Sequence, residues 1–261
     1  GTVNDLAVSG ARPLWISLAI IVEEGMPMGT LKRVLASVSA AARSANVQVV
    51  TGDTKVVPRG AADGLFLNTT GIGEIIKPGP CGVASLEVGD RILVSGPIGQ
   101  HGIAVMCARE NLGFDPPPTS DCAPLTEAVE ALRAAEVPLR AMRDATRGGM
   151  AAVLHEWAIA CNLSMSINES SIPVSDEVRG ACELLGLDPV HVANEGTMVI
   201  AVAERHADAA IAALRTVPAA CKAADIGRIE ERKLAPVIVR RGFGRELPLD
   251  EPAGAPLPRI C

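Results

Sequence analysis

The sequence is poor in aromatic residues and in positive charge. Its 261 residues include no Tyr, three Phe and two Trp, and the formal net charge at pH 7 is −6. Proteins that bind nucleic acids use basic surfaces and aromatic side chains on which bases stack. The composition therefore argues against nucleic-acid binding.

Long apolar runs and targeting signals are also missing. The longest apolar run, residues 14–22, has the length of a buried strand and falls short of the roughly 18 to 20 residues that span a bilayer. The opening GTVND has no initiator Met, no basic segment and no apolar segment, so it does not resemble a secretory signal. We expect the sequence to begin partway along a longer protein. We expect no membrane-spanning segment.

Cysteine and histidine lack the spacings of metal sites and disulfide frameworks. The seven cysteines are scattered singly without a C-x-x-C pair, which fits a reducing cytoplasm. Three of them, Cys107, Cys161 and Cys182, lie in apolar helical surroundings, where we expect small buried hydrophobes. The four histidines, at 101, 155, 191 and 206, show no paired spacing that would indicate a metal site.

Apolar residues make up 48% of the sequence, enough for a buried core, and strand-like and helix-like segments alternate along it. A polar segment with Pro and Gly at 77–82 predicts a domain boundary near residues 78–88. We expect an α+β or α/β fold with mixed strands. The predicted strands are 16–22, 47–50, 65–70, 89–95, 190–193, 198–202, 224–229 and 237–240, with a loop at 51–55. The predicted helices are 30–45, 101–111, 125–135, 148–161, 175–185 and 204–217.

The sequence ends on a cysteine, Cys261, after a stretch rich in proline and glycine at 251–258. Such a stretch forms neither helix nor central strand, so the thiol is predicted to sit at the tip of a movable arm. At roughly 3.1 Å per residue, the residues from Asp250 onward would span about 35 Å. Taken alone, the same stretch is more typical of a disordered chain end.

Polar and glycine residues cluster in five places, most of them where a predicted strand ends. Carboxylates bind Mg²⁺, Lys and Arg neutralise phosphate, and glycine lets backbone N–H groups approach a ligand. The Arg147-Gly148-Gly149 segment is the clearest case, because it precedes an apolar helix whose N-terminus favours anions. No cluster matches the Walker A or G-x-G-x-x-G patterns. The clusters are Asn4-Asp5, residues 52–55, 99–102, 143–149 and 194–196.

Each cluster also has a purely structural interpretation. The glycines at 52 and 148–149 are typical of turns, and Asp144 is suited to a helix cap or an Arg partner. Residues 194–196 are consistent with a hairpin turn between the predicted strands at 190 and 198. His101 is suited either to a cap or to phosphate donation. The residues alone leave these alternatives open.

Five segments together resemble one family. They are GTVNDLA at 1–7, TGDTKVV at 51–57, RDATRGG at 143–149, ANEG at 193–196 and the terminal PRIC at 258–261. Nearly from end to end the sequence is similar to the hydrogenase maturation proteins of the HypE carbamoyl dehydratase family. The Asn-Asp pair and glycine-rich loops resemble the wider superfamily of aminoimidazole ribonucleotide synthetase and selenophosphate synthetase, whereas PRIC is specific to HypE.

The resemblance implies a two-domain PurM-like ATP-binding fold. An N-terminal ATP-binding and dimerisation domain would occupy residues 1–88, a C-terminal α+β domain residues 89–246, and a mobile tail residues 247–261. Family members carry a further N-terminal segment ahead of the GTVND motif, so we expect the N-terminal domain to be truncated or incompletely represented.

The resemblance also implies an activity. Such an enzyme uses ATP and Mg²⁺ to dehydrate a carbamoyl group on its own terminal cysteine, converting an S-carboxamide to a thiocyanate. The carbamoyltransferase HypF would supply the carbamoyl group. The HypC–HypD scaffold would receive the cyanide for the iron of nickel–iron hydrogenase. A cytoplasmic homodimer is expected.

Site residues carry over position by position. Cys261 would be the carrier, with Lys55 and Glu195 facing the reacting group and Glu195 as the base, although either of these two residues is equally suited to ATP binding alone. The metal ligands would be Asp5, Asp53 and Asp144. The residues expected to bind ATP are Asn4, Asp5, Asp53, Thr54, Asp144, Arg147, Gly148 and Gly149.

Two other functions fit the same residues. A related ATP-dependent synthetase would act on a small-molecule acceptor, and its product would not depend on Cys261. A noncatalytic maturation scaffold would use the tail only to dock on partners, without ATP hydrolysis linked to modification of the tail.

Overall fold

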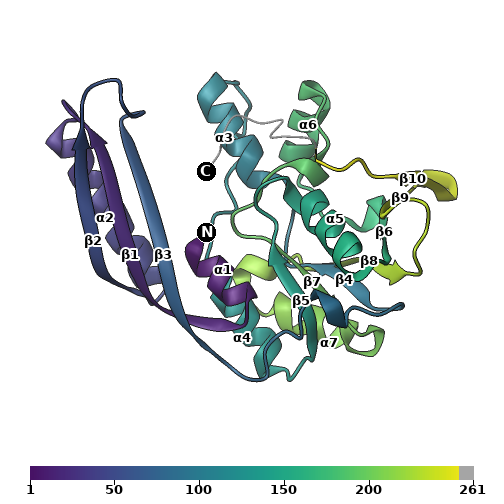
Figure 1. Cartoon of the computed structure of the whole chain (residues 1–261). Coiled ribbons are helices and arrows are strands. Elements are labelled where there is room, and N and C mark those ends of the chain that lie inside the picture. Colours follow the sequence, from purple (N-terminus) through teal and green to yellow (C-terminus); the bar gives the residue numbers. More distant parts are fainter. Residues whose placement is uncertain (253–261) are drawn as a thin grey trace. The chain divides into compact units, whose positions relative to one another are not determined.

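A computed structural model of the chain describes residues 1–252 (Figure 1). The chain separates into two compact units, the first comprising Gly1–Lys77 and the second beginning at Pro78. In the described residues, every helix is too short or too polar to cross a membrane.

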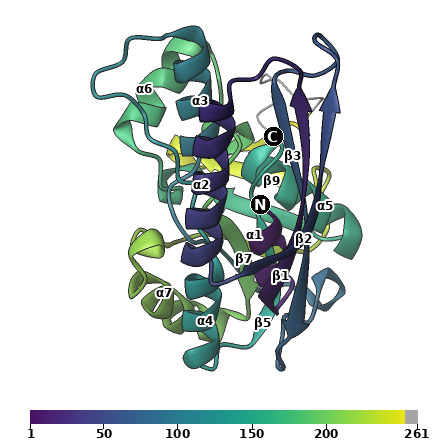
Figure 2. The ribbon, with the colours of Figure 1, turned by 90° about the vertical axis from the view of Figure 1, so that its left-hand side faces the viewer.

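The N-terminal unit is a three-stranded sheet with two helices. Its elements are α1 (Thr2–Val8), β1 (Ala11–Glu23), α2 (Met28–Ser44), β2 (Gln48–Val57) and β3 (Leu65–Ile75). The strand order is β2-β1-β3, with β1 parallel to β2 and antiparallel to β3. A parallel pair requires a crossover connection, and α2 supplies it alongside the sheet (Figure 2). Buried and exposed residues alternate along β1, as they do in a strand with one covered face.

The predicted loop at 51–55 is wrong, because strand β2 continues through these residues to Val57. Gly and Asp are depleted in strands, so local propensity indicated a loop. Pairing with β1 overrides that propensity, since Asp53 lies opposite Ala19 and Lys55 opposite Ile21. Gly52 is needed for this pairing, because a Cβ there would lie 2.2 Å from the carbonyl oxygen of Leu18.

The C-terminal unit is a seven-stranded sheet covered by helices (Figure 1). Its strands are β4 (Arg91–Val94), β5 (Leu139–Asp144), β6 (Ser164–Asn168), β7 (Met198–Val202), β8 (Ala224–Glu230), β9 (Val237–Arg241) and β10 (Arg245–Pro248). Its α-helices are α3 (Gln100–Glu110), α4 (Thr126–Ala134), α5 (Gly149–Cys161), α6 (Asp176–Leu185) and α7 (Ala207–Arg215). Short 3₁₀ turns are η1 (Val83–Ser85), η2 (Glu169–Ser171), η3 (Pro189–His191), η4 (Glu204–His206), η5 (Pro218–Ala220) and η6 (Gly242–Gly244).

The strand order β10-β9-β6-β8-β4-β7-β5 contains one parallel pair, β6 with β9, and the other pairs are antiparallel. The expectation of mixed strands is therefore confirmed. Strands β5, β6 and β10 were not predicted, and residues 190–193 form part of η3 and a loop instead of a strand. Residues 194–196 are consequently a connection from η3 to β7, and the hairpin-turn interpretation is wrong.

The main core lies between the sheet and α5. Met150, Leu154 and Trp157 of α5 pack in one cluster with Ile92 of β4 and Ile226 of β8, and all five are at most 2% exposed. A second cluster joins α3 to α6 and includes Cys107 and Cys182, as expected for buried hydrophobes. Burial raises the pKa of both thiols, that of Cys182 to about 11, so neither is reactive at neutral pH. Cys161 is only half-buried.

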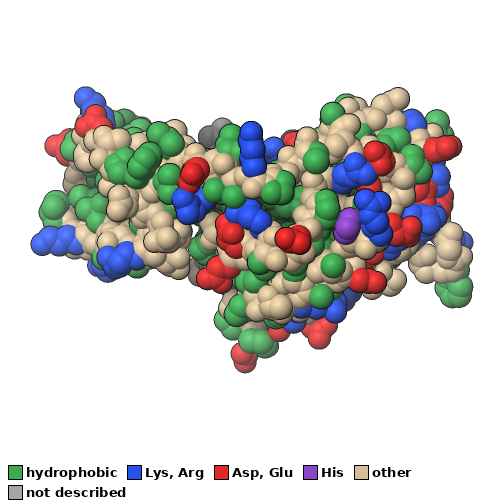
Figure 3. Space-filling view, turned by 90° about the horizontal axis from the view of Figure 1, so that it is seen from below, with side chains coloured by type: hydrophobic (Ala, Val, Ile, Leu, Met, Phe, Trp, Pro, Cys, Tyr) green, Lys and Arg blue, Asp and Glu red, His purple; other side chains and the backbone are tan. Residues whose placement is uncertain are grey.

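Charged side chains of both signs are interspersed on the face of the C-terminal unit shown in Figure 3. One group of ion pairs surrounds Glu230 at the end of β8. Its carboxylate accepts hydrogen bonds from Arg240 at 2.7 Å and Arg228 at 3.0 Å, and lies 2.7 Å from the Lys233 ammonium. Burial alone would raise the pKa of Glu230, but the hydrogen bonds from Lys233 and Arg228 and the charge of Arg240 lower it to about 2.

Replacing Glu230 with Gln is expected to lower the free energy of unfolding at pH 7 by about 1 to 3 kcal/mol, because the folded state favours the ionised carboxylate. The folded pKa of about 2 lies below the unfolded value near 4.5, so this stabilisation is present above pH 4.5 and disappears as the pH falls towards 2. Urea unfolding of both proteins across this range measures the difference. Glu204→Gln is the control, since Glu204 is 75% exposed and lies 3.9 Å from Arg91. An equal loss in the control, or a loss independent of pH, would contradict the assignment.

Candidate active site

The expected site residues of the N-terminal unit lie on α1 and β2. Asn4 is buried in α1, whereas Asp5 on the same helix is exposed. Asp53, Thr54 and Lys55 are exposed consecutive residues of β2, and successive side chains of a strand point to opposite faces. Asp53 and Lys55 therefore share one face of the sheet, and Thr54 lies on the other. The backbone N–H of Thr54 donates to the Asp53 carboxylate at 2.8 Å.

In the C-terminal unit, three of the sequence clusters are joined by one buried side chain, Asn194. Its Oδ1 accepts the N–H of Gly99 at 2.7 Å. Its Nδ2 donates to the carbonyl oxygens of Ala145 at 2.9 Å and Val192 at 3.1 Å. The loops at 99–102, 143–149 and 194–196 are thereby held together, although up to 95 residues separate them in sequence. Asn194 was not among the expected site residues.

Two helices begin at these joined loops, and each begins at a glycine with positive φ. Gly99, with φ of 83°, precedes α3, and Gly148, with φ of 76°, precedes α5. A Cβ at Gly149 would lie 2.6 Å from the carbonyl oxygen of Val190 and 2.7 Å from that of Val192, so only glycine permits this approach. The free N–H groups at the start of α5 are suited to an anion such as phosphate. Arg147 is exposed beside them.

The Asn194→Ala variant is expected to lose about 2 kcal/mol of stability, because the N–H of Gly99 and the carbonyl oxygen of Val192 lose their partner, whereas that of Ala145 keeps the backbone N–H of residue 194. Thermal or urea unfolding measures this loss. Asn68→Ala provides the control, since Asn68 is exposed on β3 and its replacement should change stability by less than about 0.5 kcal/mol. A loss below about 1 kcal/mol in Asn194→Ala would show that water or loop rearrangement satisfies the two groups.

Glu195 follows in the same loop and is held through its backbone. The carboxylate of Asp121 accepts the N–H of Glu195 at 3.1 Å and that of Gly196 at 3.0 Å. A Cβ at Gly196 would lie 1.8 Å from the carbonyl oxygen of Asp121, so the two loops touch closely. No sequence pattern predicts the role of Asp121, because it lies in an irregular stretch between α3 and α4 with no recognisable motif.

The surroundings of Glu195 favour its neutral form. Burial raises the pKa of Glu195, and the negative charges of Asp121 and Asp144 raise it further. The positive charge of His101 lowers it. Asp144 itself is 6% exposed at the end of β5, with its Oδ1 4.0 Å from the Arg143 guanidinium. A carboxylate with a raised pKa is a stronger base once ionised, which suits it to accept a proton.

The last described residues lie against the start of α5. The Nε2–H of His191 donates to the carbonyl oxygen of Asp250 at 3.0 Å, and that of His155 donates to Leu249 at 3.2 Å. Pro252 lies within 3.4 Å of the position that a Cβ at Gly148 would take. The base of the tail is thus held at the N-terminus of α5, while Cys261 lies outside the described residues.

No group of three or more His, Cys, Asp or Glu side chains among residues 1–252 is arranged to hold a metal ion. This does not conflict with the expected Mg²⁺, which is commonly bound by one or two carboxylates together with the phosphates of a nucleotide. Asp5 and Asp53 of the N-terminal unit and Asp144 of the C-terminal unit are carboxylates, the type of side chain that this ion prefers.

Comparison with known proteins first defines the class. Residues 1–75 match the N-terminal domain, and residues 87–239 the C-terminal domain, of AIR synthase related proteins. The two-domain PurM-like fold expected from the sequence is therefore confirmed.

More specific comparisons then define the family. The chain is 49% identical, over 100% of its length and 77% of the relative's, to carbamoyl dehydratase HypE of Escherichia coli. The crystal structure of E. coli HypE, a hydrogenase maturation protein, matches with a TM-score of 0.96 at 50% identity, covering 100% of this chain and 80% of the other. The chain belongs to the carbamoyl dehydratase HypE family.

Two further solved structures include a ligand or a partner. HypE in complex with ATP matches with a TM-score of 0.93 at 42% identity, covering 100% of this chain and 79% of the other. The HypE–HypF complex matches with a TM-score of 0.92 at 40% identity, covering 96% and 82%.

Proposed function

We propose that this chain is an ATP-dependent carbamoyl dehydratase that acts on its own C-terminal cysteine and supplies cyanide for the iron of nickel–iron hydrogenase. The observation that carries the proposal is the family relationship, which covers the whole chain at 49% identity. The structure of a HypE bound to ATP supports the use of this nucleotide. Cys261 follows a stretch rich in proline and glycine, a composition typical of linkers.

The reaction begins with activation of the amide oxygen, which is a poor leaving group. The oxygen of the S-carboxamide attacks the γ-phosphorus of ATP, the bond from that phosphorus to ADP breaks, and the amide nitrogen gives up one proton. Loss of the second N–H proton then forms the C≡N bond while the C–O bond breaks and phosphate leaves. The products are a thiocyanate on Cys261, ADP and phosphate.

Glu195 is the proposed base for the N–H protons, and its raised pKa supports that role. Lys55 is proposed to stabilise charge on the transferring phosphoryl group or the amide oxygen. Asn4, Asp53, Thr54, Arg147, Gly148 and Gly149 are proposed to bind ATP. The remaining carboxylates, Asp5 and Asp144, are proposed to hold Mg²⁺ with Asp53, and this ion would neutralise phosphate charge.

The base of the tail supports delivery of Cys261 to the nucleotide. Because Leu249 and Asp250 are bound by His155 and His191, and Pro252 lies beside Gly148, the remaining chain starts near the N-terminus of α5. A short tether keeps the local concentration of the carrier in the millimolar range. The carbamoyltransferase HypF is the proposed donor, in line with the HypE–HypF complex, and HypC–HypD the proposed acceptor in the cytoplasm.

A homodimer through the N-terminal unit is also proposed, because the face of its sheet that carries Asp53 and Lys55 also exposes large apolar side chains. Trp15 lies opposite Ile72 and Ile21 opposite Phe66, so all four point to the same face. Their exposures range from 38% for Ile21 to 59% for Ile72. Such a patch on a soluble protein commonly marks an interface.

Phe66→Glu is expected to convert a dimer to a monomer, since a charge placed in an apolar interface loses its hydration. Light scattering after size-exclusion chromatography measures the mass. Leu67→Glu is the comparison on the other side of the sheet, where Leu67 lies opposite the buried Ile20 and is 43% exposed, and thermal unfolding of both variants separates loss of the interface from loss of stability. A monomeric wild-type protein would rule out this interface.

The proposed reaction is tested by the mass of the C-terminal peptide. The chain is first carbamoylated with HypF and carbamoyl phosphate, purified, and then incubated with Mg²⁺ with or without ATP. Loss of one water from the Cys261 adduct only when ATP is present is the expected result. An adduct that persists with ATP here, and also in a longer HypE, would overturn the dehydratase proposal.

A further inference from the structure

The sheet of the C-terminal unit carries a group of arginines around a small cavity. Arg91 of β4 lies opposite Arg228 of β8, and Arg228 lies opposite Ser166 of β6. Arg240 of β9 lies opposite Asn168, two residues further along β6. Residues opposite one another in a sheet point to the same face. With Gly227, these five residues line a cavity of about 200 Å³.

Ser166 is the most informative residue of this cavity. The neighbouring Met165 and Ile167 belong to the core on the other face of the sheet, so the Ser166 side chain points towards the arginines. The residue is 2% exposed, and within residues 1–252 its hydroxyl oxygen has no hydrogen-bond partner. A buried hydroxyl is nearly always hydrogen-bonded, so an unpaired one indicates a partner outside the protein chain, such as a water or a ligand.

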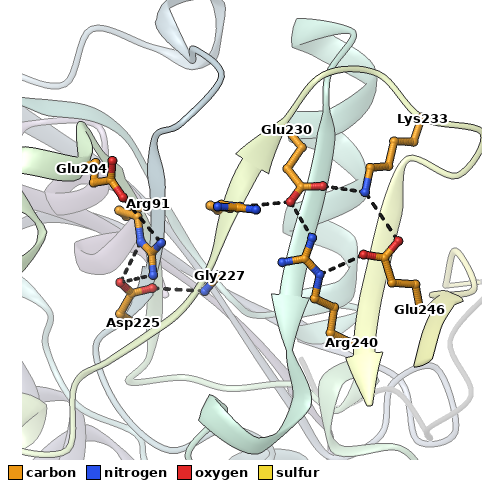
Figure 4. Close-up of polar contacts among 9 residues, drawn as sticks. Arg91, Glu204, Asp225, Gly227, Glu230, Lys233, Arg240 and Glu246 are labelled. Carbon is orange, nitrogen blue, oxygen red and sulfur yellow. Dashed lines mark hydrogen bonds and ion pairs between the residues drawn. The ribbon is translucent and has the colours of Figure 1, made fainter. Parts of the chain in front are cut away.

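Ion pairs hold two of the arginines in place beside the cavity. Arg91 binds Asp225 at 2.7 Å, and Arg240 binds Glu230 at 2.7 Å and Glu246 at 2.9 Å. Figure 4 shows these ion pairs as two groups with Gly227 between them. The acidic partners are not among the residues that line the cavity.

The remaining guanidinium donors have capacity for a ligand. Arg228 binds Glu230 through Nε alone, and Arg240 uses Nε and Nη2. Among the described residues, neither terminal nitrogen of Arg228 nor the Nη1 of Arg240 has a hydrogen-bond or ion-pair partner. Planar guanidinium groups with free N–H donors match the oxygens of phosphate.

We propose that this cavity binds a small tetrahedral oxyanion, either inorganic phosphate or the phosphate of a small monoester. Arg228, Arg240 and the hydroxyl of Ser166 donate hydrogen bonds to its oxygens. The volume of about 200 Å³ is below the roughly 300 Å³ at which pockets for larger organic ligands begin, so the cavity itself accommodates a phosphate group and not a whole nucleotide. None of the lining residues is assigned to the proposed dehydratase reaction, so the two proposals fail independently.

The test is a titration of the full chain with inorganic phosphate, and separately with methyl phosphate, at constant ionic strength set by chloride. NMR chemical shifts of the backbone amides of Gly227 and Asn168 report local binding. Saturable shifts are expected with at least one of the two ligands, and the tighter one identifies the source of the phosphate group. Absence of saturable shifts with both would overturn the proposal.

Two variants and a matched control locate the site. Arg240→Gln should weaken binding about tenfold or more, because a charge-assisted hydrogen bond is lost. Arg241→Gln is the control, since Arg241 follows on the same strand, faces the other side and also pairs with two carboxylates, Glu169 and Asp188. It should leave the affinity within about twofold, as expected for a distant surface charge.

Ser166→Ala is a second variant, in case Arg240→Gln perturbs folding. The Ser166 hydroxyl has no hydrogen-bond partner in the described protein, so its removal breaks no hydrogen bond within residues 1–252. It should weaken phosphate binding about fivefold without loss of thermal stability. Unchanged affinity in both Arg240→Gln and Ser166→Ala would overturn the proposed site.

Discussion

The Cys261→Ser variant is expected to form no thiocyanate and no carbamoyl adduct on its C-terminal peptide. A serine hydroxyl is far less nucleophilic than a thiolate, so the carrier cannot accept the carbamoyl group. ATP binding should remain at the wild-type level, because the proposed nucleotide ligands are unchanged. Peptide mass spectrometry after incubation with HypF, carbamoyl phosphate and ATP measures the product, and equilibrium binding measures the nucleotide.

Matched controls exist among the other cysteines. Cys81 and Cys221 are exposed free thiols, so Cys81→Ser and Cys221→Ser test whether any accessible cysteine suffices. Both should retain full product formation. Thiocyanate that persists in Cys261→Ser would contradict the proposed self-modification and favour a small-molecule acceptor.

The Glu195→Gln variant is expected to dehydrate the carbamoylated tail at least about 100-fold more slowly, the usual contribution of a positioned general base. Glutamine keeps the size of the side chain and the backbone contacts of Asp121, so the loop should stay in place. Rapid quenching of the carbamoylated protein after ATP addition gives the single-turnover rate. Glu156→Gln on α5, where Glu156 is exposed, is the control and should have no effect.

ATP affinity separates the two roles left open for Glu195. As a base, the residue changes the dehydration rate while the dissociation constant of ATP stays constant. An ATP affinity that falls in parallel with the rate would assign it to nucleotide binding. A rate equal to wild type would exclude both roles.

The dehydration rate is expected to fall at acidic pH. The base must be ionised, so the rate falls as the pH drops through the pKa of Glu195. Because burial and the carboxylates of Asp121 and Asp144 raise this pKa, the fall should occur above pH 4.5. In Glu195→Gln this acidic limb should disappear from the remaining activity.

Local sequence patterns predicted many of the helices and strands and failed where strand pairing overrides propensity. The helices at α2, α5 and α6 and strands β1, β7 and β8 lie close to their predicted positions. The polar residues of β2 were read as a loop, because an edge strand pairs on one side and leaves Asp53 and Lys55 exposed. Residues 190–193 were read as a strand, because a short apolar run does not distinguish a strand from the buried turn η3.

The sequence by itself determined the family and the kinds of chemistry available. The GTVND, TGDTK, RDATRGG and PRIC segments indicated the HypE family, and their carboxylates, cations and glycines indicated a phosphorylated ligand. Whether these expected residues bind ATP or metal stays a prediction.

Only the tertiary structure decided which residues hold the loops in position. Asn194 binds Gly99 and Ala145, and Asp121 binds the backbone of Glu195, across separations of 95, 49 and 74 residues. The cavity around Ser166 likewise depends on the register of β6 with β8 and β9. Strand register and loop docking result from the packing of the whole core, so no local pattern at Asn194, Asp121 or Ser166 encodes them.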